Sequence, residues 1–286
     1  MKMMMMTMVK RRALGSLDGS WRGAPGRIVV LAVLAVAGAA GCATAQAAGG
    51  ADATSYEWRG AMPAGGTLEI KGVNGAVRAL RASGSEVSVT ATLRGRRSDP
   101  STVRIERVEH AGGLTFCAVY PSPSGEEANS CAPGEGGRMN TRRNDVEVEF
   151  RVEVPAGVPF RGRTVNGSVH AVDLDSDTDV ATVNGDVEVS TSRGAQARTV
   201  NGSIEARFGA ALSEDVTFET VNGGISLSVP ADLDANLEAR WLNGGLDSDI
   251  PISVRGRMGR GRATGTLGSG GPTLRLVTVN GSIRIR

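Results

Sequence analysis

The tripeptide Val-Asn-Gly or Leu-Asn-Gly occurs seven times in this chain, and it limits the possible folds more than any other feature. Successive copies are 92, 18, 17, 21, 21 and 37 residues apart. The two long steps are close to multiples of the short ones, and a repeat of about 20 residues is typical of a solenoid. The asparagines of the seven copies are Asn74, Asn166, Asn184, Asn201, Asn222, Asn243 and Asn280.

Alignment of the copies on asparagine shows a strand after each corner. The position three residues after asparagine is aliphatic in every copy, and the next position is polar. This alternation predicts a strand with one buried face. Thr stands two residues before asparagine in five copies, and its short branched side chain favours strands. The aliphatic positions are Val77, Val169, Val187, Ile204, Ile225, Leu246 and Ile283.

Two architectures are compatible with these strands. Asn-Gly between strands is a strong hairpin signal, which would give an antiparallel meander or sandwich. However, the residue directly before asparagine is aliphatic in all seven copies, and a two-residue hairpin would leave it in solvent. A corner that points it into a stacked core would bury it. We therefore predict an all-β, parallel β-solenoid with rungs of ~18–21 residues, Asn-Gly corners and an amide ladder of stacked asparagines.

The composition supports thin layers of aliphatic side chains rather than a core of aromatic rings. The 286 residues include 40 Gly but only 5 Phe, 3 Trp and 2 Tyr. We expect residues 42–66 to form a flexible tether, and residues 67–286 to form one solenoid domain with an irregular insertion at 121–144. A Gly-rich loop with four arginines is expected to begin at Arg255.

Residues 1–41 have the pattern of a signal peptide. Six basic residues precede the apolar run Ile28–Ala40, which is too short to span a membrane. The sequence Ala39-Ala40-Gly41-Cys42 resembles a lipobox, so Cys42 is the predicted lipidation site, although it has Ala39 where Leu is commonest. Ordinary cleavage after Ala45 or Ala47 is the alternative. Removal of six basic and one acidic residue from totals of 32 and 30 leaves 26 and 29, which gives a formal charge of −3.

A negative mature chain gives little support to a nucleic-acid partner. If Cys42 carries lipid, Cys117 and Cys131 remain as a pair that flanks a Pro- and Gly-rich segment. A disulfide that closes this segment is the favoured interpretation. Metal binding is the rival interpretation, but two thiols with only His110 nearby leave a tetrahedral site incomplete. No metal and no cofactor are expected.

These repeats resemble a bacterial family of exported, adhesin-like domains of unknown function. The resemblance is carried by the Val-Asn-Gly repeat, the segment Cys117-Ala-Val-Tyr-Pro121, a second Cys, and the strand end Val154–Val158. It covers roughly residues 66–286. It implies a β-helix-like fold and an envelope location, and it supplies no catalytic residues.

Few side chains suggest chemistry. His170 falls in the polar outward column, and His110 lies near a turn. Four alternating aspartates from Asp173 to Asp179 resemble a calcium loop but lack its Gly and its final Glu, so a solvated acidic turn is favoured. The Arg255–Arg262 arginines could grip phosphate or acidic polysaccharide, and Trp58 or Trp241 could stack on sugars. Structural roles are the preferred interpretation for all of these.

We therefore expect a non-catalytic, adhesin-like envelope lipoprotein that binds or scaffolds. Its expected location is the cell envelope, as an outer-membrane or periplasm-facing lipoprotein that could be exposed on the cell surface. The expected partners are the membrane, through the lipid anchor, and an unknown envelope protein or polysaccharide. An envelope signalling or stress component is the alternative, and a glycan-active β-helix enzyme is less favoured. The chain ends in the strand-like segment Ser282–Arg286, so self-association through this last rung is also expected.

Overall fold

The computed structural model describes residues 55–209, 211–254 and 261–286. All of them belong to the compact unit Gly50–Arg286, and the predicted signal peptide and the predicted lipidation site Cys42 lie outside the described residues. The described chain is almost entirely β-structure, with one short 3-10 helix at Pro100–Thr102. None of the described segments is a helix with the length and hydropathy needed to cross a membrane.

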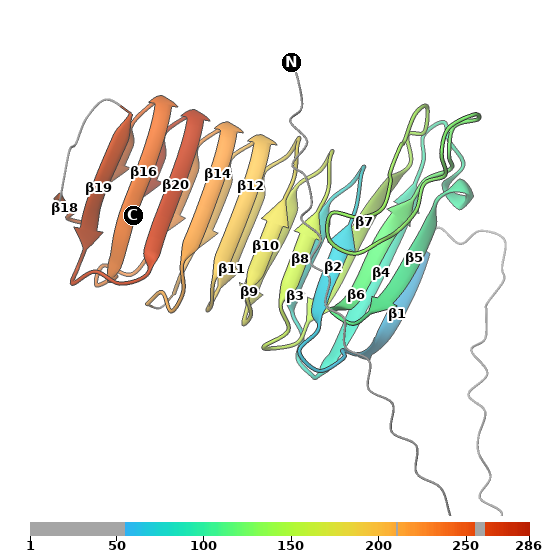
Figure 1. Ribbon diagram of the computed structural model, residues 1–286, viewed down its shortest axis with the longest axis horizontal. Helices are drawn as coiled ribbons and strands as arrows, with labels where there is room; N and C mark the ends of the chain where they lie inside the picture. The colour runs from blue at the N-terminus through green and yellow to red at the C-terminus, as the bar shows by residue number, and fades with distance from the viewer. Residues whose placement is uncertain (1–54, 210, 255–260) are drawn as a thin grey trace, which may run out of the picture. The chain divides into compact units, whose positions relative to one another are not determined.

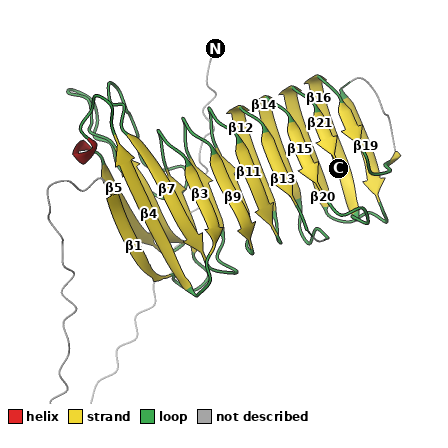
Figure 2. Cartoon of the chain, turned by 180° about the vertical axis from the view of Figure 1, so that it is seen from behind, coloured by secondary structure: helices red, strands yellow, loops and turns green. Residues whose placement is uncertain are grey.

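The strands form two sheets that face each other (Figures 1 and 2). In spatial order, the first sheet contains β1 (Ser55–Ala61), β4 (Glu86–Arg94), β7 (Glu147–Val154), β3 (Val77–Arg81), β9 (Val169–Leu174), β11 (Val187–Thr191), β13 (Ile204–Arg207), β15 (Ile225–Ser228), β21 (Ile283–Ile285) and β17 (Leu246–Ser248). The second sheet contains β18 (Ser253–Val254), β19 (Arg262–Leu267), β16 (Ala235–Asn243), β20 (Thr273–Asn280), β14 (Val216–Asn222), β12 (Ala195–Asn201), β10 (Thr178–Ala181), β8 (Phe160–Arg163), β2 (Thr67–Lys71), β6 (Gly113–Val119) and β5 (Arg104–His110).

The middle of both sheets is a parallel β-solenoid, as the repeat predicts. Each rung runs along a strand of the second sheet, turns at Asn-Gly and continues along a strand of the first sheet. The rungs stack in register, so that Asn201 of β12 lies opposite Asn222 of β14. In the first sheet, Ile204 of β13 lies opposite Ile225 of β15. The inward residues of both sheets form one continuous core.

The asparagines form the predicted amide ladder along the corner. Six of the seven side chains donate from Nδ2 to Oδ1 of a neighbouring asparagine at 2.7–2.9 Å, and Asn74 at the end of the ladder accepts. The glycine that follows each asparagine is required by close stacking. A Cβ atom on Gly202 would collide with the carbonyl group of Gly185 in the adjacent rung, and the other corner glycines face the same obstacle. The Asn-Gly corner is therefore part of the stacking surface.

Most of the residues directly before asparagine do not point into the core, although Val73 does, and this corrects the reason given for preferring the solenoid. Five of the seven are exposed, namely Val165, Val183, Val200, Val221 and Leu242. The strand alternation continues to the corner, so Thr199 points inward and is 4% exposed while Val200 points outward and is 40% exposed. The buried Thr hydroxyl donates to a glycine carbonyl of the adjacent rung, for example Thr199 Oγ1 to Gly185 O at 2.9 Å.

The ends of the sheets depart from a regular solenoid. β1, β4 and β5 pair antiparallel with their neighbours at one end, and β19 does so at the other. The prediction of a flexible tether at 42–66 is wrong for Ser55–Ala61, because these residues form the edge strand β1. Residues 121–144 contain no strand, which agrees with an irregular insertion.

The C-terminal rung is internal to the stack. β20 lies between β14 and β16, and β21 lies between β15 and β17 (Figure 1). The asparagine ladder therefore runs from Asn222 to Asn280 and only then to Asn243. The premise of self-association through a free last rung is wrong, since both strand edges of β21 are already paired.

Candidate binding site on the second sheet

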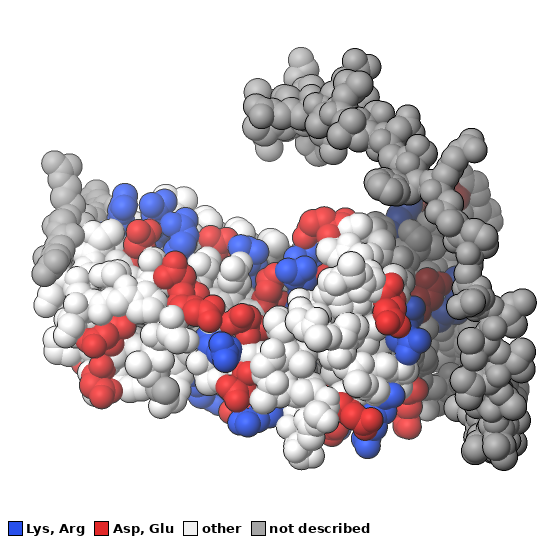
Figure 3. Space-filling model, turned by 60° about the horizontal axis from the view of Figure 1, so that its bottom comes forward, with Lys and Arg blue, Asp and Glu red and all other residues white. Residues whose placement is uncertain are grey.

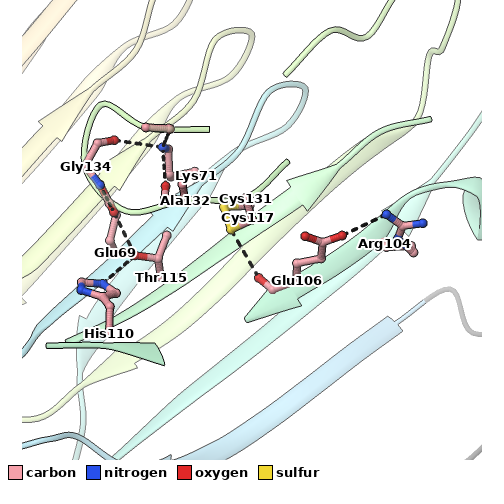
Figure 4. The surroundings of a disulfide bond; sticks show 11 residues. Glu69, Lys71, Arg104, Glu106, His110, Thr115, Cys117, Cys131, Ala132 and Gly134 are labelled. Carbon is pink, nitrogen blue, oxygen red and sulfur yellow. Dashed lines mark hydrogen bonds and ion pairs between the residues drawn. A yellow bond between two sulfur atoms is a disulfide. The ribbon is translucent and has the colours of Figure 1, made fainter. Parts of the chain in front are cut away.

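The insertion at 121–144 covers part of the outer face of the second sheet. β6 is buried at all seven positions, although only alternate residues of a strand can face the core. A disulfide joins Cys117 on β6 to Cys131 in the insertion, with the Cα atoms 5.7 Å apart. The predicted cysteine pair is therefore present, and it fixes the insertion to the sheet (Figure 4).

Lys71 fixes the next part of the insertion. Its Nζ donates to the carbonyl oxygens of Ala132, Gly134 and Gly136 at 2.9, 2.9 and 2.6 Å. Burial lowers the pKa of Lys71, and the nearby Glu69 carboxylate opposes this shift. Three carbonyl acceptors match the three donors of an ammonium group, so residues 132–136 form a turn around the side chain of Lys71.

The base of the insertion is held by buried side-chain bonds. Tyr120 donates through its hydroxyl to the carbonyl oxygen of Val146 at 2.8 Å, and burial raises the pKa of Tyr120 to about 12. The buried Asn129 donates to the carbonyl oxygens of Tyr120 and Asn140 at 2.9 and 2.8 Å. These contacts hold the two ends of the insertion together where it leaves the sheet.

Glu69 of β2 lies beneath the insertion and is 3% exposed. Its Oε2 accepts hydrogen bonds from Thr115 Oγ1 at 3.0 Å and from the Gly134 backbone N–H at 2.8 Å. Its Oε1 is buried and has no hydrogen-bond partner among the described residues. The nearest cation is Arg161 of β8, whose Nη1 lies 3.9 Å from this oxygen.

His110 completes a short polar chain with Thr115 and Glu69 (Figure 4). The backbone N–H of Gly112 donates to Nδ1 of His110 at 3.1 Å, so this nitrogen has no proton. The proton of the neutral ring is therefore on Nε2, which lies 3.1 Å from Thr115 Oγ1. The hydroxyl oxygen of Thr115 accepts a hydrogen bond from this N–H, and the hydroxyl donates a hydrogen bond to Glu69 Oε2.

These side chains surround an open cavity of about 360 Å³. The floor is formed by Thr67, Glu69 and Arg161, one wall by His110, and the opposite wall by Pro133 and Gly134. A second cavity of about 290 Å³ shares Thr67 and Arg161 with the first. It continues across the face of the sheet to β10 and β12, where Asp179 and Gln196 line it.

Of the charged groups that line these cavities, Glu69, Arg161 and Asp179 are paired, whereas Asp177, Glu214 and Asp215 of the second cavity have no ion pair among the described residues. Arg161 Nε donates to Asp179 Oδ2 at 3.2 Å. Arg163 lies 3.7 Å from the same oxygen and also pairs with Glu135 of the insertion, and this hydrogen bond lowers the pKa of Glu135. Figure 3 shows both acidic and basic side chains on the face that it presents, with several acidic side chains next to one another.

The other residues singled out in the sequence have structural contacts. Asp173 bonds Ser190, and Asp175 pairs with Arg81 and Ser192. No group of acidic, His or Cys side chains among the described residues could hold a metal ion. His170 pairs with Glu188 at 3.1 Å.

The two tryptophans singled out have packing roles. Trp58 packs on Phe116 with the ring centroids 5.2 Å apart, and Arg107 lies over the ring of Trp58. Trp241 packs against the core from β16. Of the arginine-rich loop, 255–260 lie outside the described residues, and Arg262 begins β19.

Glu69 and Arg161 are not among the residues predicted from the sequence. Both lie five residues before an asparagine of the repeat, as do Asp179 and Gln196, and the structure places all four in one outward column of the second sheet. This column could have been aligned in the same way as the columns after asparagine. The burial of Glu69 could not have been predicted from this alignment, because it depends on the insertion.

The family model described as Toastrack DUF4097 matches residues 163–286. This segment is similar to the Toastrack family. Its boundaries begin at the end of β8, so Glu69, His110 and Arg161 lie before the matched Toastrack segment. The match agrees with the resemblance seen in the sequence, and it covers a shorter stretch.

Two solved structures are distantly similar to this chain. A putative cell adhesion protein from Clostridium sporogenes ATCC 15579 has a TM-score of 0.44 and 12% identity, over 81% of this chain and 98% of the other. A putative adhesin from Bacteroides fragilis NCTC 9343 has a TM-score of 0.31 and 9% identity, over 81% and 97%. No curated protein matches the chain. Similarity at this level carries no conclusion about activity or ligand.

Proposed function

We propose that this protein is a non-catalytic, adhesin-like binding or scaffolding protein of the cell envelope. The observation that carries the proposal is the walled cavity on a stiff, stacked scaffold. Its polar groups are fixed by the disulfide and by the three hydrogen bonds of Lys71. Such prepositioned groups favour binding because little ordering is left to do when a ligand arrives.

The location follows from the cysteines and the N-terminal sequence. Disulfides persist in oxidising compartments, so the bond between Cys117 and Cys131 indicates export. Residues 1–41 supply an export signal, and lipid on Cys42 would anchor the protein to a membrane. On this proposal, a polysaccharide or protein of the envelope meets the outer face of the second sheet.

Protease shaving of intact cells tests the location. Cells produce the tagged full chain or its Cys42→Ala variant, beside a periplasmic control protein. We expect the native chain in the membrane fraction and the variant in the soluble fraction. A native chain that stays soluble would contradict the lipid anchor. Digestion of the native chain while the control is protected would favour surface adhesion.

Co-sedimentation with insoluble envelope material tests binding. We expect the purified full-length Cys42→Ala chain to pellet with lipid-extracted envelopes, and we expect this binding to be saturable. Chain that has been reduced and alkylated serves as the matched control, because it lacks the fixed cavity wall. Equal recovery of both forms, or no pelleting at all, would overturn the proposal.

A further inference from the structure

The unpaired oxygen of Glu69 is the starting point. A buried carboxylate oxygen without a hydrogen-bond donor is costly, and such atoms are rare in folded proteins. Oε1 has no partner among the described residues, and Glu69 forms part of the cavity floor. A ligand group that donates a hydrogen bond in this cavity would satisfy the oxygen.

The charge around the cavity selects a neutral ligand. Glu69 contributes one negative charge and Arg161 one positive charge, and they lie 3.9 Å apart. His110 is neutral in the tautomer that its contacts require. An ammonium group at Oε1 would meet the guanidinium of Arg161, and an anion would meet the carboxylate of Glu69. Either charged ligand would be repelled by one of these two groups.

The arrangement of donors and acceptors selects hydroxyl groups. Glu69 Oε1 can only accept a hydrogen bond, and the guanidinium of Arg161 can only donate. One hydroxyl of a ligand can donate to the first, and a neighbouring hydroxyl can accept from the second. A ligand with adjacent hydroxyls on a compact ring therefore matches this pair, and a cavity of about 360 Å³ is within the usual range for small ligands.

The second cavity extends the site along the sheet. It shares Thr67 and Arg161 with the first and adds Gln196, whose amide both donates and accepts. We propose that Glu69, Arg161 and the Pro133–Gly134 wall form a subsite for one neutral sugar residue of a polysaccharide. Further residues of the polymer lie across β10 and β12. This inference rests on the proposed function and names its ligand class.

Amide NMR of the full-length Cys42→Ala chain tests the subsite directly. The probes are uncharged tetrasaccharides of glucose, mannose and N-acetylglucosamine. We expect at least one to shift the Gly134 amide and the His110 ring signals in a saturable way. If none of the three shifts Gly134, the proposal is overturned.

Glu69→Gln is the decisive variant. Thr115 and Gly134 both donate hydrogen bonds to Oε2 of Glu69. In the variant, the Gln carbonyl oxygen takes the position of Oε2, and the amide N–H₂ takes the position of Oε1 and faces the cavity. We expect at least a tenfold loss of affinity. Glu238→Gln makes the same charge change on the outer face of β16, away from the cavities, and is expected to bind normally. Equal affinity of Glu69→Gln and the unchanged chain overturns the subsite.

Two further measurements separate the possible failures. If Glu69→Gln does not fold, Arg161→Gln replaces it, with the same expected loss. Co-sedimentation of Glu69→Gln with envelopes then separates this proposal from the proposed function. If Glu69→Gln pellets with envelopes as fully as the unchanged chain, and no tetrasaccharide shifts the NMR signals, the proposed subsite is wrong but the proposed binding function is still supported.

Discussion

The corner glycines show how one missing atom sets the spacing of the stack. In each corner the glycine lies against a carbonyl group of the neighbouring rung, where a Cβ atom has no room. Asparagine holds the same corner from its other side through the amide ladder. The two residues together fix both the distance between rungs and their register.

Gly202→Ala is expected to destabilise the fold strongly. The added methyl group would collide with the backbone of Gly185, and neither backbone can move without breaking the ladder. We expect a loss of about 2–3 kcal/mol in the free energy of unfolding, measured by urea denaturation. Gly84→Ala, where the methyl group meets open space, is the control. Similar losses in both variants would contradict a stacking role for Gly202.

The raised pKa of Tyr120 predicts that the protein loses stability at high pH. Burial raises the pKa of Tyr120 from 10.0 to about 12, so the folded chain keeps a proton that the unfolded chain loses. This contribution is complete below pH 10 and disappears as the pH rises through about 12.

The measurement is the free energy of unfolding between pH 8.5 and 11.5. Tyr120→Phe should be less stable at pH 8.5, because it lacks the bond to Val146, but its stability should depend less on pH. Tyr56, whose pKa burial also raises, keeps part of the slope in both chains. Parallel curves for the two chains would show that Tyr120 does not carry the effect.

At the scale of elements, the insertion is what turns a plain sheet face into a site. β2 and β6 would otherwise present Glu69 and Thr115 to water, as the outward columns of other rungs do. Residues 131–136 cover them, held by the disulfide and by Lys71. The cavity wall thus depends on contacts from outside the repeat.

Removal of the disulfide should loosen the wall more than the solenoid. Cys117→Ser with Cys131→Ser opens a loop whose ends are 14 residues apart, at a cost of about 3 kcal/mol in the chain-entropy model. We expect fast hydrogen exchange at the Gly134 amide and unchanged exchange at Ile204 of β13. Equal acceleration at both amides would show that the bridge stabilises the whole stack.

The elements differ in how far the sequence predicts them. The repeat predicts the strands after each corner, the amide ladder and the parallel stack, because each of these depends on residues within one period. It does not predict that the insertion buries Glu69, since that contact joins segments 65 residues apart. The expectation that Val200 is buried failed because the strand alternation continues through Thr199 up to the corner.

At the scale of the whole described unit, the stacking order differs from the chain order. Asn280 occupies the ladder position between Asn222 and Asn243, so the last residues separate two earlier rungs. In a regular solenoid the last rung contacts one neighbour only. Here its loss affects rungs on both sides.

Deletion of residues 273–286 is therefore expected to release more than the deleted rung. β16 and β17 would lose their pairing with β20 and β21, and β19 is attached through β16. Limited proteolysis should cut throughout 235–267, while 160–207 stay protected. A deletion variant in which β16 remains resistant would contradict this prediction.

The internal position of β20 and β21 also bears on how the protein is made. A ribosome or an export channel delivers the chain from the N-terminus, so rungs up to Asn222 can assemble as they emerge. Asn243 emerges next, but its place beside Asn280 does not exist until the final residues are free. The order of synthesis is therefore not the order of assembly, and the rung that contains β16 can close only after residues 273–280 have emerged.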